Sequence, residues 1–498
     1  MKKEIAISFI FTIFINVLNF FQNKFFVKYM GMDILGMMKL FSQILAYLNI
    51  VELGLGTASA VALYKPLAEK NYKKVSIIVN TMENIYNKIA LIIFLSGILV
   101  MPFLQFFIDE SHLNIKIYFY WGLYIFQTII TYLYIKYVIL FTANQEYLFV
   151  KIIQSCSKIL IQILQIIILI KFQSFFIYIF LFILDSLIQY IFFKKHYNKE
   201  YNYITKSKEK YNEIKNNVKN LFWHKIGSLV VFNTDLILIS KFVSLEVVGI
   251  YASYQMVISI VNTAMGIIIG VILPKIGKYV ATTSKEEVYN LFKKISCLFI
   301  FSAIFFTFNI YFLINPFIKL WIGMEFIFEK EIIVLILINF FIGVIRKPID
   351  IFKDTIGYFE DIQSPIYEAI INFVISIILG MKLGLKGIII GTIASNITII
   401  MIYKPILVFK NCFKKNLREY VFFYTKYTFL TLISFNILYI IVKLFIKENT
   451  INTWKEWIII AIIISIVSLI TIFIIFLLNY EFRDIIKDLF KIKKKKYY

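Results

Sequence analysis

The stretch that decides the fold is Met30–Lys74, MGMDILGMMKLFSQILAYLNIVELGLGTASAVALYKPLAEKNYKK. It begins at a tight polar corner, continues through largely apolar residues and ends in a basic loop. Because a helix of about 20 apolar residues crosses a bilayer, this pattern predicts one transmembrane crossing over 35–64. Glu52 lies well inside that crossing, and a charge in hydrocarbon costs roughly 2.5–3.5 kcal/mol on insertion scales. We therefore expect Glu52 to face a bundle interior or a water-filled cavity.

The composition of the whole chain is that of a membrane protein. Its 498 residues are 60% hydrophobic and only 17% charged, whereas a soluble domain is usually about half apolar and about a quarter charged. Lipid offers no hydrogen-bond partner to an open strand edge, so the crossings must be helices. The expected fold class is an all-α polytopic membrane protein.

Hydrophobic runs bounded by polar breaks predict about fourteen transmembrane helices. In chain order we expect them at 5–27, 35–64, 76–108, 117–142, 147–170, 174–193, 221–243, 247–273, 287–314, 330–348, 363–381, 385–409, 420–446 and 455–479.

The net charge of +23 is spread unevenly over the breaks between these runs. Alternate breaks are strongly basic, as at 65–74, 194–225, 275–285 and 410–418, while the others are short and near neutral. The positive-inside rule therefore predicts that the basic breaks and both termini are cytoplasmic. This placement favours membrane lipids as partners and disfavours nucleic acid, which requires a basic groove or patch.

An internal repeat relates the two halves of the chain. KYMGMDILG begins at Lys28 and KFVSLEVVG at Lys241, a separation of 241 − 28 = 213, and Val75 and Val288 keep that separation. The copies are six crossings apart, so they have the same orientation in the membrane, an architecture seen in secondary transporters.

The repeat predicts the domain organisation. We expect two parallel six-helix lobes, a linker, two additional helices and a basic tail. The ranges are 1–195 for the first lobe, 196–220 for a cytoplasmic linker that includes a short surface helix, 221–410 for the second lobe, 411–480 for the two helices and 481–498 for the cytoplasmic tail.

No catalytic or metal-binding motif is recognisable. The three histidines and three cysteines are isolated from one another, and no Walker loop, GxSxG, HExxH or CxxC occurs. We therefore expect no enzyme, no cofactor and no metal.

Charged residues within or at the ends of the crossings are the candidates for substrate binding: Lys24, Glu52, Lys136, Lys158, His224, Lys225, Asp235 and Lys241. Cations in a wet cavity between lobes suit an anionic substrate, particularly a phosphate or diphosphate. A mid-membrane acid suits a coupling H⁺ or Na⁺, or balances a lysine. The structural alternative for each is an interhelical hydrogen bond, a snorkelling lysine or an internal ion pair.

The acids predict an asymmetric cavity. Counting 265 − 52 = 213 places Met265 at the position equivalent to Glu52. Glu52 would then serve one lobe and Asp235 the other.

Three stretches resemble a known family: KYMGMDILGMMKLFSQILAYLNIVELGLGTASA, NLFWHKIGSLVVFNTDLILISKFVSLEVVGIYASYQMVISIVN and PIYEAIINFVISIILGMKLGLKGIIIGTIASN. They are similar to polysaccharide repeat-unit flippases of the O-antigen and capsule type, in the multidrug/oligosaccharidyl-lipid/polysaccharide exporter superfamily. The resemblance implies alternating-access transport of an undecaprenyl-diphosphate-linked oligosaccharide from the cytoplasmic to the outer leaflet of the bacterial plasma membrane. It also implies a polymerase and glycosyltransferases of the same pathway as partners.

The family's cationic cavity matches the roles expected for Lys24, Lys158 and Lys225, and Asp235 falls where the family usually has an acid. Two alternatives remain. A small-molecule cation exporter of the same superfamily would favour an acidic or aromatic cavity, and a membrane polymerase or glycosyltransferase would need a sizeable loop.

Overall fold

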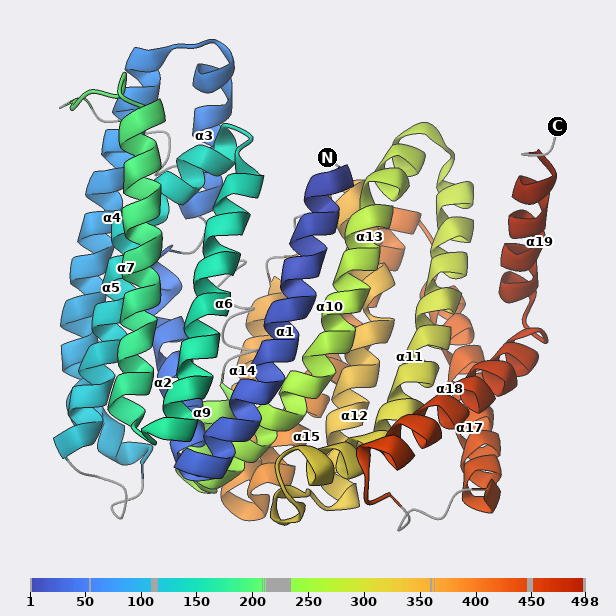
Figure 1. The fold of residues 1–498 in the computed structure, drawn as a ribbon. Coiled ribbons are helices and arrows are strands. Elements are labelled where there is room, and N and C mark those ends of the chain that lie inside the picture. The colour runs from blue at the N-terminus through green and yellow to red at the C-terminus, as the bar shows by residue number, and fades with distance from the viewer. Residues whose placement is uncertain are drawn as a thin grey trace. The chain divides into compact units, whose positions relative to one another are not determined.

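A computed structural model describes residues 2–52, 55–108, 115–207, 209, 211, 234–358, 361, 363–445 and 451–495. The chain divides into two compact units, Met1–Gly249 (unit 1) and Ile250–Tyr498 (unit 2). Every regular element in these ranges is a helix, as Figure 1 shows, which confirms the predicted all-α fold.

Unit 1 is a bundle of long helices. α1 packs against α6, and α5 packs against both α4 and α7. Its elements are α1 (Lys2–Met30), α2 (Met32–Leu48), η1 (Asn49–Glu52), α3 (Leu55–Ala68), α4 (Tyr72–Val100), η2 (Met101–Phe106), α5 (Ile115–Ala143), α6 (Tyr147–Lys171), α7 (Phe175–Glu200), α9 (Asp235–Phe242) and the first turn of α10 (Leu245–Thr282).

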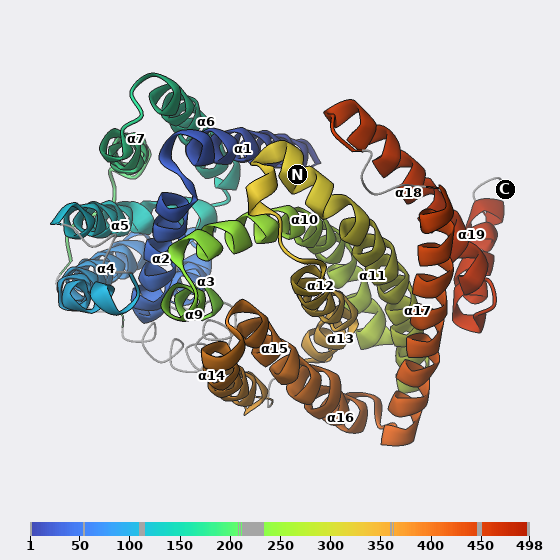
Figure 2. The same cartoon turned by 90° about the horizontal axis from the view of Figure 1, so that it is seen from below.

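Unit 2 is organised around α11 (Lys285–Trp321), which packs against α12 and α18 (Figure 2). Its other elements are α10 from Ile250 onward, η3 (Met324–Phe326), α12 (Lys330–Ile345), α13 (Lys347–Ile356), α14 (Gln363–Leu383), α15 (Leu385–Ser395), η4 (Asn396–Tyr403), α16 (Lys404–Val408), η5 (Phe409–Phe413), α17 (Leu417–Phe445), α18 (Trp454–Phe476) and α19 (Tyr480–Lys495). The basic tail is thus largely helical, and Lys294 of α11 holds it at Asp484, 2.5 Å away.

Twelve helices in the described ranges are long and apolar enough to cross a membrane. They correspond to twelve of the fourteen predicted crossings. The seventh, over 221–243, lies mostly outside the described residues, and α9 forms its end. The surface helix expected in the linker likewise falls mainly on residues that are not described.

The second crossing is the place where the prediction was wrong. An uninterrupted helix over 35–64 was expected, but α2 ends at Leu48, a 3₁₀ turn follows, and α3 begins at Leu55. The break falls on Asn-Ile-Val-Glu followed by Leu-Gly-Leu-Gly, the last two residues of which begin α3. Asparagine, β-branched residues and glycine all have low helix propensity. Hydrogen bonds from the Tyr132 hydroxyl to the side chains of Asn49 and Glu52 stabilise the break.

The repeat is visible in where the helices begin. α2 starts at Met32 and α10 at Leu245, and 245 − 32 = 213. α4 starts at Tyr72 and α11 at Lys285, and 285 − 72 = 213. Asn71 and Ser284, the residues before the second pair, both accept a hydrogen bond from a backbone N–H of the first helical turn. The two copies therefore share register and capping chemistry.

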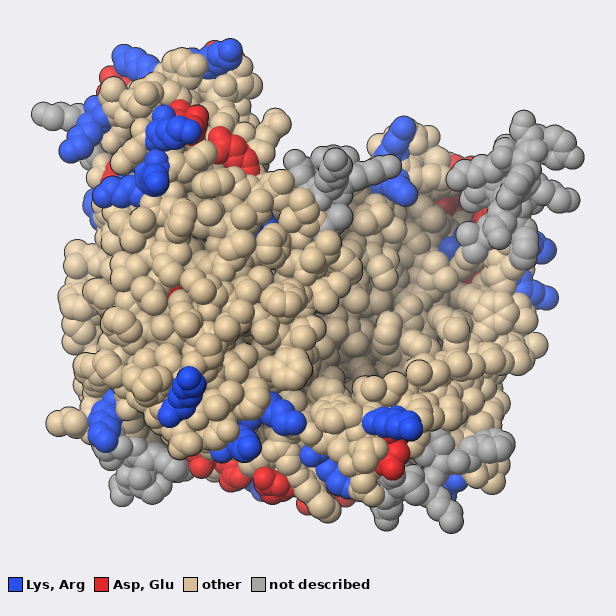
Figure 3. Space-filling view, in the orientation of Figure 1, with Lys and Arg blue, Asp and Glu red and all other residues tan. Residues whose placement is uncertain are grey.

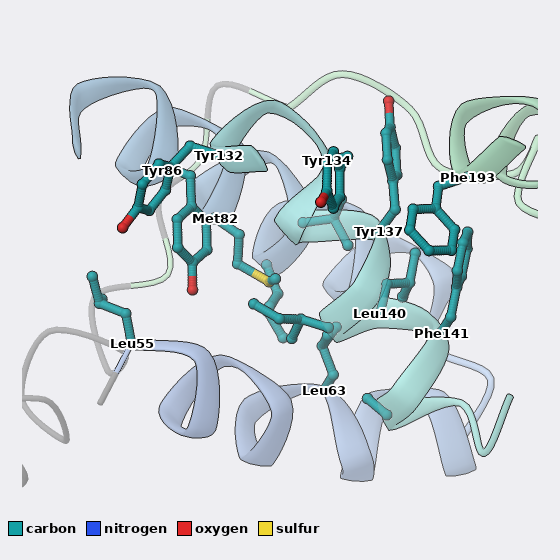
Figure 4. Packing of buried hydrophobic residues seen from close by; sticks show 14 of the residues in the cluster. Leu55, Leu63, Met82, Tyr86, Tyr132, Tyr134, Tyr137, Leu140, Phe141 and Phe193 are labelled. Carbon is teal, nitrogen blue, oxygen red and sulfur yellow. The ribbon is translucent and has the colours of Figure 1, made fainter. Parts of the chain in front are cut away.

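The hydrophobic core of unit 1 is rich in aromatic rings. Figure 4 shows Tyr86, Tyr132, Tyr137 and Phe141 packed with aliphatic residues such as Leu63 between α3, α4 and α5. On the face shown in Figure 3, the charged side chains of both units gather at the helix ends, and the band between is almost free of them. This is the surface expected of a protein that sits in lipid.

Candidate functional site

A basic face in unit 1 brings together lysines of α2 and α6, and α1 carries a third lysine, Lys24. Lys24 on α1 and Lys39 on α2 lie seven and eight residues from Gly31, where the chain turns back with a φ of 91°. At 1.5 Å per helical residue, each lysine is about 11 Å from the turn. The two ammonium-bearing side chains therefore start from similar depths on neighbouring helices.

Lys158 on α6 completes this face. Its positive charge is repelled by that of Lys39 and attracted by the carboxylate of Asp185 on α7. Asp185 also accepts a hydrogen bond from the Ser157 hydroxyl. The local charge is positive, because two lysines, Lys39 and Lys158, lie near the single carboxylate of Asp185. Such a face attracts an anion through charge-assisted hydrogen bonds.

Sequence reasoning missed Lys39. A signal was present, since Lys39 is the only lysine between Lys28 and Lys65 and lies in the apolar part of the crossing.

A row of amides holds the helices that carry the lysines. Gln162 donates to Asn19 Oδ1 at 2.5 Å, and Gln22 donates to Gln165 Oε1 at 2.7 Å and to the Tyr178 hydroxyl at 2.6 Å. Buried polar groups in a bundle are normally paired in this way. Lys158 lies one turn before Gln162 on α6, so this row positions it relative to α1.

Glu52 has tyrosines for neighbours. The Tyr132 hydroxyl donates to Glu52 Oε2 at 2.8 Å and to Asn49 Oδ1 at 3.0 Å, and Tyr86 lies close enough to interact electrostatically with the carboxylate. The partner that the sequence left open is therefore Tyr132.

The remaining sequence candidates have separate surroundings. Lys136 is buried and pairs with Glu83 at 2.5 Å, while Lys241 is exposed and lies 5.8 Å from the centre of the Phe106 ring. Asp235 is the first residue of α9, where the helix dipole favours a negative charge. His224 and Lys225 lie outside the described residues. Substrate binding by each of these residues stays a prediction.

Unit 2 contains an ionic cluster of its own. Arg346 lies 3.4 Å from Asp350 and 3.6 Å from Glu368, and Lys404 also pairs with Asp350. Lys347 interacts with Arg346 and Asp350, so three cations surround two acids. Glu368 and Lys404 are distant from Arg346 in the sequence, and no local pattern pointed to them.

No group of three or more His, Cys, Asp or Glu residues in the described part of the chain is arranged to hold a metal ion.

No family model matches the chain, and no curated protein matches it in sequence. Among solved structures, a lipid II flippase MurJ in an inward closed conformation has a TM-score of 0.66 and 16% identity, covering 97% of this chain and 100% of its own. An inward-facing multidrug resistance MATE family transporter of the MOP superfamily has a TM-score of 0.54 and 11% identity, covering 78% and 94%. At these identities the likeness shows the fold alone, and that fold agrees with the one expected from the resemblance.

Proposed function

We propose that the protein is a flippase for an undecaprenyl-diphosphate-linked oligosaccharide repeat unit, which it moves from the cytoplasmic to the outer leaflet of the bacterial plasma membrane by alternating access. The observation that carries the proposal is the fold shared with a lipid II flippase along 97% of the chain. The basic face of unit 1 supports an anionic headgroup as the part of the substrate that is bound.

In this proposal Lys24, Lys39 and Lys158 bind the diphosphate. A lysine ammonium has three donors and acts as a mobile point charge, which suits a headgroup that must bind and then leave. Asp185 balances the lysines when no substrate is present. Moving charge across the membrane is worth about 2.3 kcal/mol per unit charge per 100 mV, so the membrane potential supplements any H⁺ or Na⁺ gradient.

The charge pattern of the loops supports placing both termini in the cytoplasm. A glycosyltransferase would then supply the substrate from the cytoplasmic side, and a polymerase would consume it on the other side.

The test is surface glycan in a host that lacks its own flippase for the repeat unit. Lys39→Gln and Lys158→Glu each remove a charge-assisted contact worth about 1.5–3 kcal/mol, so we expect at least a tenfold loss of surface glycan at equal protein level. Lys171→Gln, an exposed lysine at the end of α6, is the matched control. Normal glycan in both basic-face variants would overturn the proposal.

A second candidate is a small-molecule cation exporter, because the MATE transporter shares the fold over 78% of the chain. Lysines on the basic face of unit 1 disfavour a cationic substrate. Efflux of cationic drugs from a sensitive host, unaffected by Lys39→Gln, would favour this candidate.

A further inference from the structure

Two adjoining cavities lie beside α11 in unit 2. The first, the apolar cavity, has a volume of ≈ 430 Å³ and is walled by residues of α11, α12 and α17 that include Phe308, Leu337, Phe341 and Phe435. The second, the basic cavity, has a volume of ≈ 390 Å³. Tyr311 and Phe312 line both cavities, so the two adjoin each other along α11. Figure 2 shows α11 with α12 and α17 beside it.

The basic cavity carries positive charge. Its charged lining residues are Lys319, near the end of α11, and Lys330, at the start of α12. Lys319 donates to Asn452 Oδ1 at 2.7 Å and to the Ile451 carbonyl at 3.5 Å, and it also interacts electrostatically with Glu456 of α18.

Aromatic rings mark the depth of the two lysines. Phe317 packs with Trp321, Trp454 and Trp457 at centroid distances of 5.6, 5.5 and 5.4 Å. Tryptophans gather at the level of lipid headgroups. Lys319 therefore lies at headgroup depth.

The apolar cavity extends from there into the hydrocarbon region. Its deepest lining residue on α11 is Thr307, twelve residues before Lys319. At 1.5 Å per residue this is about 18 Å along the helix, close to half of the roughly 30 Å hydrocarbon core.

From this arrangement we infer that the two cavities form a binding site for one anionic glycerophospholipid, with an acyl chain in the apolar cavity and the phosphate at Lys319 and Lys330. The charge selects an anionic headgroup. The length of one leaflet matches an ordinary acyl chain better than a polyprenyl chain, which is long enough to span the bilayer. The bound lipid would fill the space between α12 and the additional helix α17.

The test uses the full chain in nanodiscs of phosphatidylcholine with a minor fraction of phosphatidylglycerol, and native mass spectrometry counts the lipids that remain bound. Each lysine near the membrane surface is worth about a fivefold change in affinity, so Lys319→Gln/Lys330→Gln should lower phosphatidylglycerol binding about 25-fold. Lys382→Gln, an exposed lysine at the end of α14, should bind as the wild type does.

A second variant tests the apolar cavity without touching the charges. Ile338→Trp places a larger side chain at a partly exposed position of its wall, and it should also reduce phosphatidylglycerol binding. Equal binding of the two lipids by the wild type, unchanged binding in both variants, or displacement of phosphatidylglycerol by a polyprenyl diphosphate would each overturn the inference. None of these measurements depends on flippase activity, so the proposed function stands or falls separately.

Discussion

Two acidic residues of unit 1 are held by tyrosine hydroxyls. Tyr132 donates to Glu52 at 2.8 Å, and Tyr201 donates to Glu146 at 2.5 Å. A tyrosine satisfies a carboxylate with one strong hydrogen bond and adds no second charge. At the residue scale, this pairing decides how the two acids respond to mutation.

Tyr132→Phe removes the donor to Glu52 and Asn49 but keeps the ring. A hydrogen bond to a charged group is worth about 1.5–3 kcal/mol, so we expect a lower melting temperature for the purified protein. Glu52→Gln should cost less, since an amide oxygen still accepts from Tyr132. The control is Tyr64→Phe, at a side chain that is 53% exposed. Equal melting temperatures for the two tyrosine variants would contradict this role for Tyr132.

Glu146 lies between α5 and α6, outside the spanning helices. Burial raises its pKa, but hydrogen bonds from Tyr201, His196 and Asn144 outweigh burial and leave the pKa below the usual 4.5. Burial and the hydrogen bond to Glu146 raise the pKa of Tyr201, so that tyrosine stays neutral throughout the acidic range.

A carboxyl whose pKa is lowered by folding stabilises the fold above its unfolded-state pKa, and this contribution is lost as pH falls through the folded value. Glu146→Gln should therefore lower the melting temperature near pH 7, and the gap to the wild type should narrow below about pH 4. Thermal unfolding across pH measures this, with exposed Glu69→Gln as the control. A gap that stays constant down to acidic pH would refute it.

At the element scale, the corners of the repeat meet each other within unit 1. A Cβ added at Gly36 would overlap the backbone carbonyl of Leu245, and one added at Gly249 would lie 2.6 Å from the carbonyl oxygen of Met32. Gly36 and Gly249 are equivalent in the repeat (249 − 36 = 213), and so are Met32 and Leu245 (245 − 32 = 213). The contact of Gly36 with Leu245 is therefore equivalent to the contact of Gly249 with Met32. The start of α2 and the start of α10 thus cross through a pseudo-symmetric glycine contact.

Gly36→Ala and Gly249→Ala should both destabilise the protein, because each new methyl group meets backbone that cannot rotate away. Gly343→Ala is the control, since a Cβ there meets nothing within 4 Å and alanine favours a helix by about 1 kcal/mol over glycine. Thermal unfolding and detergent-resistant yield are the measurements. If all three variants behaved alike, the close crossing would be wrong.

At the scale of the whole molecule, the described residues hold twelve candidate spans and the broken second crossing, and the fourteen crossings predicted from the sequence are an even number. An even number places the two termini on one side of the membrane. The basic loops then predict which side that is.

Labelling of single cysteines tests this topology in a background with Cys156, Cys297 and Cys412 replaced by serine. Lys382 lies in a near-neutral break and Lys74 in a basic one, and both side chains are exposed. An impermeant maleimide should label Lys382→Cys in intact cells but label Lys74→Cys only after permeabilisation. The reverse pattern would invert the predicted orientation.

The sequence by itself determined the fold class, most of the crossings and the register of the repeat. It could do so because these depend on local chemistry. Lipid cannot pair with backbone groups, so apolar runs must become helices, and helix starts at Tyr72 and Lys285 follow from capping residues next to them. The helix break at Asn49 falls on residues of low helix propensity, but such propensities are too weak to predict a break within a long apolar run.

Only the tertiary structure decided which charges meet. Lys39 approaches Lys158 from another helix, Tyr132 reaches Glu52 across 80 residues of chain, and Lys404 joins Asp350 across 54. Hydropathy records how deep a residue lies, but pairing depends on the rotation of each helix and the side chains packed between them. The sequence therefore predicted that lysines form a basic site. Only the packing of α2 against its neighbours showed that Lys39 belongs to it.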